Sequence, residues 1–223
     1  PGPTEPAESP AAGPVRAEQR AVGREGAAQI GSLTTDQVAK GLTTDHVVAL
    51  TSEQAQSLTV GQMAALTTEQ VSVMQTEDFS ALKTAQVAAL TTTQIAGLTT
   101  TTLSGLETTD LKALTATQVK ALTTNQIGAL TAAEVTTLSS AQVVALTDAQ
   151  IGALNTTQVK ALDVTDVAAL STSQVNVLAT EDVAALSASQ VGALSTDQVA
   201  SLTTNQVAAL TTSEAAAMSA AQA

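Results

Sequence analysis

Apolar residues recur in this chain at an interval of eight. The stretch Thr203–Leu210 shows the unit, Thr-Thr-Asn-Gln-Val-Ala-Ala-Leu. We number its positions 1 to 8: positions 5 and 8 are apolar, and position 7 is small. The unit first appears at Thr34, in a copy that Lys40-Gly41 lengthens to nine residues, and from Thr43 to Ser219 it repeats 22 times without an insertion.

The polar positions of each octad predict a helix start. Position 1 is nearly always Thr, Ser, Asn or Asp, whose side-chain oxygens cap helix N-termini. Position 4 is mostly Gln, which completes a capping box with position 1. The Leu before the cap and the apolar residue at position 5 have the spacing of a hydrophobic staple. Each octad therefore predicts one short helix, with positions 5 and 8 on the same face.

Four octads lack a good capping residue at position 1. All four carry Thr at position 2, so we expect Thr to remain a capping candidate there. The residues at position 1 are Gln75, Lys83, Glu107 and Ala179, and those at position 2 are Thr76, Thr84, Thr108 and Thr180. Conversely, Val or Ala occupies position 2 only where position 1 is Thr, Asp or Ser (Val60, Ala116, Ala132, Val164, Ala188).

The period of eight separates the possible folds. In one continuous helix, the apolar face would turn by about 80° per octad at 3.6 residues per turn. A coiled coil needs a period of about 3.5 or 3.67. A β-solenoid is the main rival, because Thr and Val favour strands. Leu, Ala and Gln favour helix, and an apolar spacing of five then three breaks strand alternation. We predict an all-α solenoid of stacked short helices, one per octad.

The composition divides the chain into three predicted parts. Residues 1–14 hold all five prolines and predict an extended segment. Residues 15–32 predict a short basic helix or N-terminal cap, and they contain every arginine, Arg16, Arg20 and Arg24. A second interpretation makes this part a docking element for the acidic body of another subunit. Residues 33–223 form the predicted octapeptide-repeat solenoid.

The charge and composition exclude several functions. The formal net charge is −12 at pH 7, which argues against binding to nucleic acid or to anionic membranes. Cysteine is absent, so there is no disulfide framework and no thiol chemistry. No apolar run is long enough to predict a membrane span. The chain begins without Met and has no recognisable signal peptide, so we expect a processed product or an excerpt of a longer protein.

The candidate residues for chemistry are few. His46, the only histidine, replaces Gln at position 4 and has no second His or Cys with which to bind a metal. The pairs Glu77-Asp78 and Glu181-Asp182 could serve acid–base catalysis or Ca²⁺ binding, but they fall at positions 3 and 4, where helix starts favour negative charge. We expect no catalytic residue, no cofactor-binding residue, no metal site and no enzyme activity.

Two nine-residue runs carry a resemblance. LTTNQVAAL at Leu202–Leu210 and LTTTQIAGL at Leu90–Leu98 resemble octapeptide tracts of very large bacterial surface, adhesin-like or haem-utilisation proteins. The resemblance covers about residues 33–223. It implies a bacterial protein that is extracellular or on the cell surface. It carries over no binding residue, and nothing besides His46 and three Met residues would suggest haem.

The function expected from these observations is structural. We predict a rod or fibre subunit that associates mainly with itself. The alternatives are a solenoid that binds another surface protein and a passive spacer within a giant adhesin. A binding solenoid predicts unusual residues at one outward position over consecutive octads, and position 6 shows no such patch.

Overall fold

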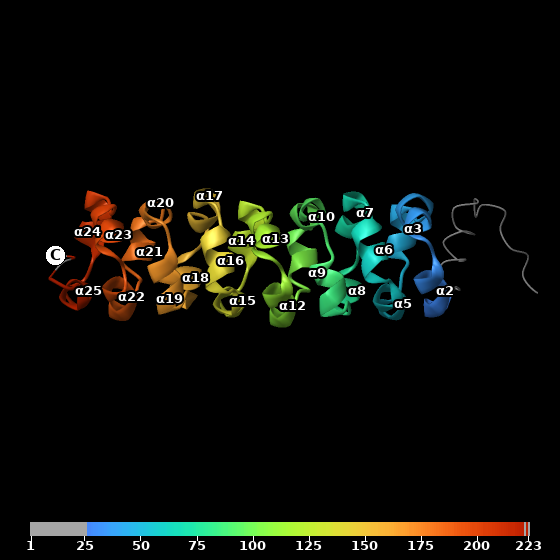
Figure 1. The fold of residues 1–223 in the computed structure, drawn as a ribbon, viewed down its shortest axis with the longest axis horizontal. Coiled ribbons are helices and arrows are strands. Elements are labelled where there is room, and N and C mark those ends of the chain that lie inside the picture. The colour runs from blue at the N-terminus through green and yellow to red at the C-terminus, as the bar shows by residue number, and fades with distance from the viewer. Residues whose placement is uncertain (1–25, 221, 223) are drawn as a thin grey trace, which may run out of the picture.

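The protein is an elongated rod of short helices, seen in a computed structural model that describes residues 26–220 and 222. The helices follow one another from the N-terminal to the C-terminal end of the rod (Figure 1). In the described residues there are 24 helices and no strand, which confirms the predicted all-α solenoid with one helix per octad. The predicted segment 1–14 and most of the predicted segment 15–32 lie outside the described residues.

The helices have four to seven residues each. Their bounds are α2 Ala27–Ser32, α3 Thr35–Gly41, α4 Thr44–Val48, α5 Ser52–Ser57, α6 Val60–Ala65, α7 Thr68–Ser72, α8 Thr76–Ser80, α9 Thr84–Ala88, α10 Thr92–Gly97, α11 Thr100–Leu103, α12 Thr108–Ala113, α13 Ala116–Lys120, α14 Thr124–Ala129, α15 Ala132–Thr137, α16 Ser140–Ala145, α17 Asp148–Ile151, α18 Thr156–Ala161, α19 Val164–Ala169, α20 Thr172–Asn176, α21 Thr180–Val183, α22 Ala188–Gly192, α23 Thr196–Ala200, α24 Thr204–Ala209 and α25 Thr212–Ala217.

The capping box starts most helices as the sequence predicts. At α10, Thr91 is extended (φ −71°, ψ 159°), and its Oγ1 accepts from the Gln94 N–H at 3.2 Å. The Gln94 Oε1 in turn accepts from the Thr91 N–H at 2.6 Å. Two of the amide hydrogens that a helix start leaves without partners are thereby bound.

The expectation that Thr at position 2 caps the four exceptional octads is wrong. Each of these helices still has position 1 as its extended N-cap residue, and that residue makes no side-chain capping bond. Position 2 is already the first helical residue, whereas a capping side chain belongs to the extended residue before it. At Lys83 and Glu107 the other half of the box persists, because the residue at position 4 accepts from the N–H of position 1.

Each helix ends without a left-handed residue. None of the described residues has a positive φ. Instead the Leu at position 8 is extended, as at Leu98 (φ −61°, ψ 139°), and the next N-cap, Thr99, is extended too (φ −72°, ψ 155°). Two successive extended residues redirect the chain, so the linkers need neither the Gly nor the Pro that usually ends helices.

The helices wind into a coil in which each packs on the helix three places along. Every strongly contacting pair differs by three, for example α2 with α5, α13 with α16 and α22 with α25. In the upper half of Figure 1 the labels run α3, α7, α10, then α13 and α14, then α17 and α20. One turn of the solenoid therefore takes between three and four octads.

A single apolar core runs the length of the rod. It consists of the residues at positions 5 and 8, such as Val119 (0% exposed) and Leu122 (3% exposed). The predicted apolar face is thus confirmed. One octad cannot enclose these side chains, so the turns before and after it complete their burial.

Small residues allow neighbouring turns to approach closely. A Cβ added at Gly97, position 7 of its octad, would collide with the Thr68 side chain. A Cβ at Gly192, position 6, would lie 2.9 Å from the Ala217 carbonyl oxygen. At these two positions glycine is needed for space, since neither has a positive φ.

The N-terminal end follows the same packing. α2 lies before Leu33, within the segment predicted as a basic helix or cap, and packs on α5 as the other helices three places apart do. The extra residue of the first copy is absorbed within α3, whose seven residues run from Thr35 to Gly41.

No helix in residues 26–220 is long and apolar enough to cross a membrane.

Two adjacent threonines, Thr91 and Thr92, test whether position 1 caps the helix. Thr91→Ala removes the side chain that accepts from Gln94 N–H, and we expect it to lower the free energy of unfolding by about 1 kcal/mol. Thr92→Ala alters an exposed position 2, where Ala occurs in other octads, and should change stability by less than about 0.5 kcal/mol. Urea unfolding followed by circular dichroism measures both. An equal loss of stability in the two variants would contradict the assignment of the cap to position 1.

Candidate functional site

The glutamine at position 4 joins each turn of the solenoid to an earlier one. Gln126 is almost fully buried, with 1% of its surface exposed. Its Oε1 accepts from the Thr123 N–H at 2.6 Å, which is the capping box of its own helix. Its Nε2 donates to the carbonyl oxygens of Ile95 at 2.9 Å and Leu98 at 2.7 Å. One amide therefore binds the start of α14 and the end of α10, four octads back.

This arrangement repeats as a ladder along the rod, which we call the glutamine ladder. In each rung the Nε2 donates to the carbonyl of a Leu at position 8, which lies 28 residues earlier, or 29 where the nine-residue copy intervenes. The rungs are Gln62, Gln70, Gln86, Gln94, Gln118, Gln126, Gln142, Gln150, Gln158, Gln174, Gln190, Gln198, Gln206 and Gln222.

Aspartate at position 4 makes a different contact between turns. Its shorter side chain accepts a hydrogen bond from a hydroxyl at position 2 of the octad three places earlier. Ser52 Oγ donates to Asp78 Oδ1 at 2.8 Å, and Ser140 Oγ donates to Asp166 Oδ1 at 2.7 Å. Thr156 Oγ1 donates to Asp182 Oδ1 at 2.8 Å. The buried carboxylate of Asp thus gains a hydrogen-bond donor. Asp has no side-chain amide, however, so it donates nothing to the Leu carbonyl that a Gln at this position would bind.

Two aspartates have shifted pKa values. Burial raises the pKa of Asp78 above its ordinary value, the hydrogen bond from Ser52 opposes this rise, and the neighbouring Glu77 adds to it. At the exposed N-cap Asp163, hydrogen bonds from the Thr165 hydroxyl and the Asp166 N–H lower the pKa. Burial thus makes Asp78 easier to protonate than an ordinary aspartate, whereas its hydrogen bonds make Asp163 harder to protonate.

Glutamate and histidine at position 4 keep the cap and lose the rung. Glu134 and Glu214 accept from the N–H of Thr131 and Thr211, each at 2.6 Å, but a carboxylate has no amide to donate. His46 behaves in the same way, with its Nδ1 accepting from the Thr43 N–H at 3.2 Å. In these octads the side chain at position 4 donates no hydrogen bond to the carbonyls of an earlier turn.

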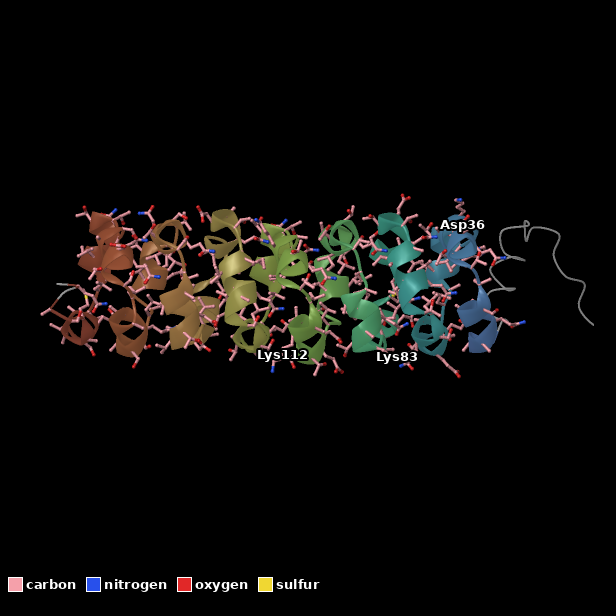
Figure 2. The ribbon with its side chains drawn as sticks, viewed as in Figure 1. Asp36, Lys83 and Lys112 are labelled. Carbon is pink, nitrogen blue, oxygen red and sulfur yellow. The ribbon has the colours of Figure 1, made fainter. Side chains whose placement is uncertain are left out.

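The structure does not bring the candidate catalytic and metal-binding residues together. His46 is a capping residue, as the repeat suggests. Asp78 and Asp182 are buried and accept hydrogen bonds from Ser52 and Thr156, whereas Glu77 and Glu181 are exposed. Among the described residues no three His, Cys, Asp or Glu side chains come together as they would to hold a metal ion. Lys83 and Lys112 extend away from the rod (Figure 2), as the outward position 6 predicts for Lys112.

The sequence predicts the capping role of this glutamine but not its hydrogen bonds to an earlier turn. The capping box accounts for its oxygen, but Glu caps equally well. Glu nevertheless occupies position 4 only at residues 134 and 214. This preference for the amide over the carboxylate is the signal that could have revealed the contact between turns.

A known family matches this pattern. A profile of the ALTTAQ repeat matches residues 71–106, 103–140, 133–164, 159–196 and 177–212, which together cover more than half of the chain. The chain belongs to the ALTTAQ repeat family. In the letters of that name the final Gln is position 4, so the family's label includes both the capping Thr and the rung of the ladder. None of the curated proteins compared with the chain matches it.

The amide hydrogen bonds between turns of the ALTTAQ repeat can be tested with isosteric changes. Gln126→Glu keeps the cap but leaves the buried Ile95 and Leu98 carbonyls without donors, so we expect it to lower the free energy of unfolding by about 2–4 kcal/mol. Glu134→Gln supplies an amide where one is missing and should raise the free energy of unfolding by about 1 kcal/mol. Glu69→Gln, at an exposed position 3, is the control for the charge change. Urea unfolding midpoints decide, and a Glu134→Gln variant no more stable than Glu69→Gln would contradict the ladder.

The buried aspartate predicts a pH dependence. Because the pKa of Asp78 is raised in the folded state, the folded chain retains a proton that the unfolded chain has lost. The contribution of Asp78 to stability therefore falls as pH rises from its ordinary pKa of 3.8 through the raised value. Asp78→Asn keeps an acceptor for Ser52 and should make stability less pH-dependent above pH 3.8. Exposed Asp45→Asn is the control, and identical pH profiles of the two variants would refute the assignment.

Proposed function

We propose that this chain is a structural rod, a subunit of an extracellular or cell-surface fibre that forms by association of the repeat solenoid with itself. The observation that carries the proposal is the glutamine ladder, which repeats the same hydrogen bonds between turns in most octads along the rod. A scaffold of this kind gains length by adding turns without any change in its core.

The outward surface also supports a structural role. Positions 1, 2, 3 and 6 present mainly Thr, Ser and Ala, and the large apolar residues exposed there are scattered singly. Val48, Val144 and Val164, each 41–43% exposed, lie on α4, α16 and α19. Scattered apolar residues are ordinary on a soluble surface, so no side of the rod favours a particular protein partner.

The proposal is tested by the state of assembly. We expect the full chain to lengthen into uniform filaments, one solenoid wide, as its concentration rises in sedimentation velocity and negative-stain electron microscopy. The cross-section should stay constant because growth occurs at the ends. A chain that stays a short single rod at every concentration would refute the fibre and leave the passive spacer or the binding solenoid.

A further inference from the structure

Hydrogen bonds between turns are missing from one part of the rod, residues 99–138, which lies in the green middle of Figure 1. Of its five octads, only those with Gln118 and Gln126 at position 4 carry a glutamine rung. We propose that this part is a joint, at which the turns of the solenoid open before those on either side. The inference goes beyond the proposed fibre and does not depend on it, since a spacer of the same structure would have the same joint.

The first octad of the joint has a short side chain in place of the rung. Thr102, at position 4, is buried, and its Oγ1 lies 2.9 Å from the Thr99 Oγ1 of its own octad. A glutamine here would bind the carbonyl of Met74, which lies 28 residues earlier. Met74 is only 2% exposed, and its carbonyl oxygen accepts no hydrogen bond from any described residue. The first octad therefore makes no position-4 bond to the turn before it.

The second octad of the joint lacks both kinds of link. Asp110 accepts from the Glu107 N–H at 3.2 Å, a bond within its own helix start. Thr84, at position 2 three octads earlier, has a hydroxyl, but no hydrogen bond joins this described residue to Asp110. The other three buried aspartates at position 4 each have such a donor. The buried Leu82 carbonyl, 28 residues before Asp110, also accepts no hydrogen bond within the described part of the chain.

The last octad of the joint lacks a link as well. Glu134 accepts from the Thr131 N–H at 2.6 Å and donates nothing to an earlier turn. The Leu106 carbonyl, 28 residues before it, is therefore left without a donor among the residues that the structure describes. One further bond, from Thr76 Oγ1 to the Thr101 carbonyl, is exposed and, at 3.4 Å, longer than hydroxyl bonds usually are.

The rod is fully linked on both sides of the joint. In residues 59–98 and 139–210, every position 4 is either a glutamine rung or an aspartate that accepts from a hydroxyl of an earlier turn. The rungs are Gln62, Gln70, Gln86, Gln94, Gln142, Gln150, Gln158, Gln174, Gln190, Gln198 and Gln206, and the aspartates are Asp78, Asp166 and Asp182.

The missing links lie on one side of a turn. Thr102 and Asp110 belong to consecutive octads, and the rungs Gln118 and Gln126 belong to the next two. Because these four octads make about one turn, the turn is bonded to the preceding one over half of its circumference and not over the other half. An opening motion can then pivot on the bonded half.

The apolar core continues through the joint and keeps the rod in one piece. Leu103, Leu106, Leu111 and Leu114 are all buried, with 6% or less of each exposed. Apolar contact is non-directional, whereas a hydrogen bond requires a particular distance and angle. The core therefore holds the turns of the joint together without fixing their spacing as the ladder does elsewhere.

Hydrogen exchange of the full chain, followed by mass spectrometry under native conditions, tests the joint. Residues 103–114 and 151–162 occupy the same octad positions, the first in the joint and the second between the rungs Gln150 and Gln158 and the octad after them. We expect the amides of 103–114 to exchange about tenfold faster or more, because local opening there breaks fewer hydrogen bonds. Equal exchange rates in the two segments would overturn the inference.

Restoring the missing amides should close the joint. In the double variant Thr102→Gln with Asp110→Gln, exchange of residues 103–114 should slow by about tenfold, since the Met74 and Leu82 carbonyls gain donors. The matched control changes a threonine and an acidic residue at exposed positions, Thr101→Gln with Glu69→Gln, and should leave the rates as they are. A restored variant that exchanges as fast as this control would overturn the joint.

The reverse change keeps the test decisive if the restored variant does not fold. Gln150→Thr with Gln158→Thr copies the side chain of Thr102 into the linked part of the rod. Exchange of residues 151–162 should then rise about tenfold, towards the rate of 103–114 in the unmodified chain. Exchange that stays at the unmodified rate would mean that the amide bonds do not decide where the turns open, which overturns the inference. None of these measurements depends on whether the chain forms filaments.

Discussion

The glutamine amide at position 4 is the interaction on which this fold depends. A helix leaves four N–H groups and four carbonyls without partners at its ends. In helices of four to seven residues almost every backbone group is an end group. The Gln126 side chain reduces this cost at both kinds of end, because its oxygen binds the start of α14 and its nitrogen binds the end of α10. Helices that are far too short to be stable alone can then persist in series.

The same contact explains the period and the constancy of the spacing. The amide reaches a Leu carbonyl 28 residues back, and the Leu side chains fill the core beside it. A residue inserted into one octad would shift position 4 against the carbonyls of the preceding turn. The nine-residue copy is tolerated at the start of the rod, where α3 takes up the extra residue and Gln62 still reaches Leu33.

The sequence predicts what depends on neighbours along the chain. One helix per octad, the cap at position 1 and the core at positions 5 and 8 all follow from spacing within about ten residues. The number of octads per turn was not predicted, because it is set by contacts 25 to 32 residues apart. The pairing of Ser52 with Asp78 was missed for the same reason. The hypothesis of a cap at position 2 was wrong because two extended residues, not the strongest capping side chain, decide where each helix begins.

The aspartates at position 4 show how the fold tolerates change. Where Asp replaces Gln, the residue at position 2 three octads earlier is a hydroxyl in all four cases, Ser52, Thr84, Ser140 and Thr156. Val or Ala occupies that position only where its partner is Gln or Glu, as Val60 does three octads before Gln86. A buried carboxylate requires a donor, whereas a buried amide supplies its own hydrogen bonds. Positions 2 and 4 of different turns are therefore one unit of the structure, so neither a single octad nor a single turn contains a complete set of these contacts.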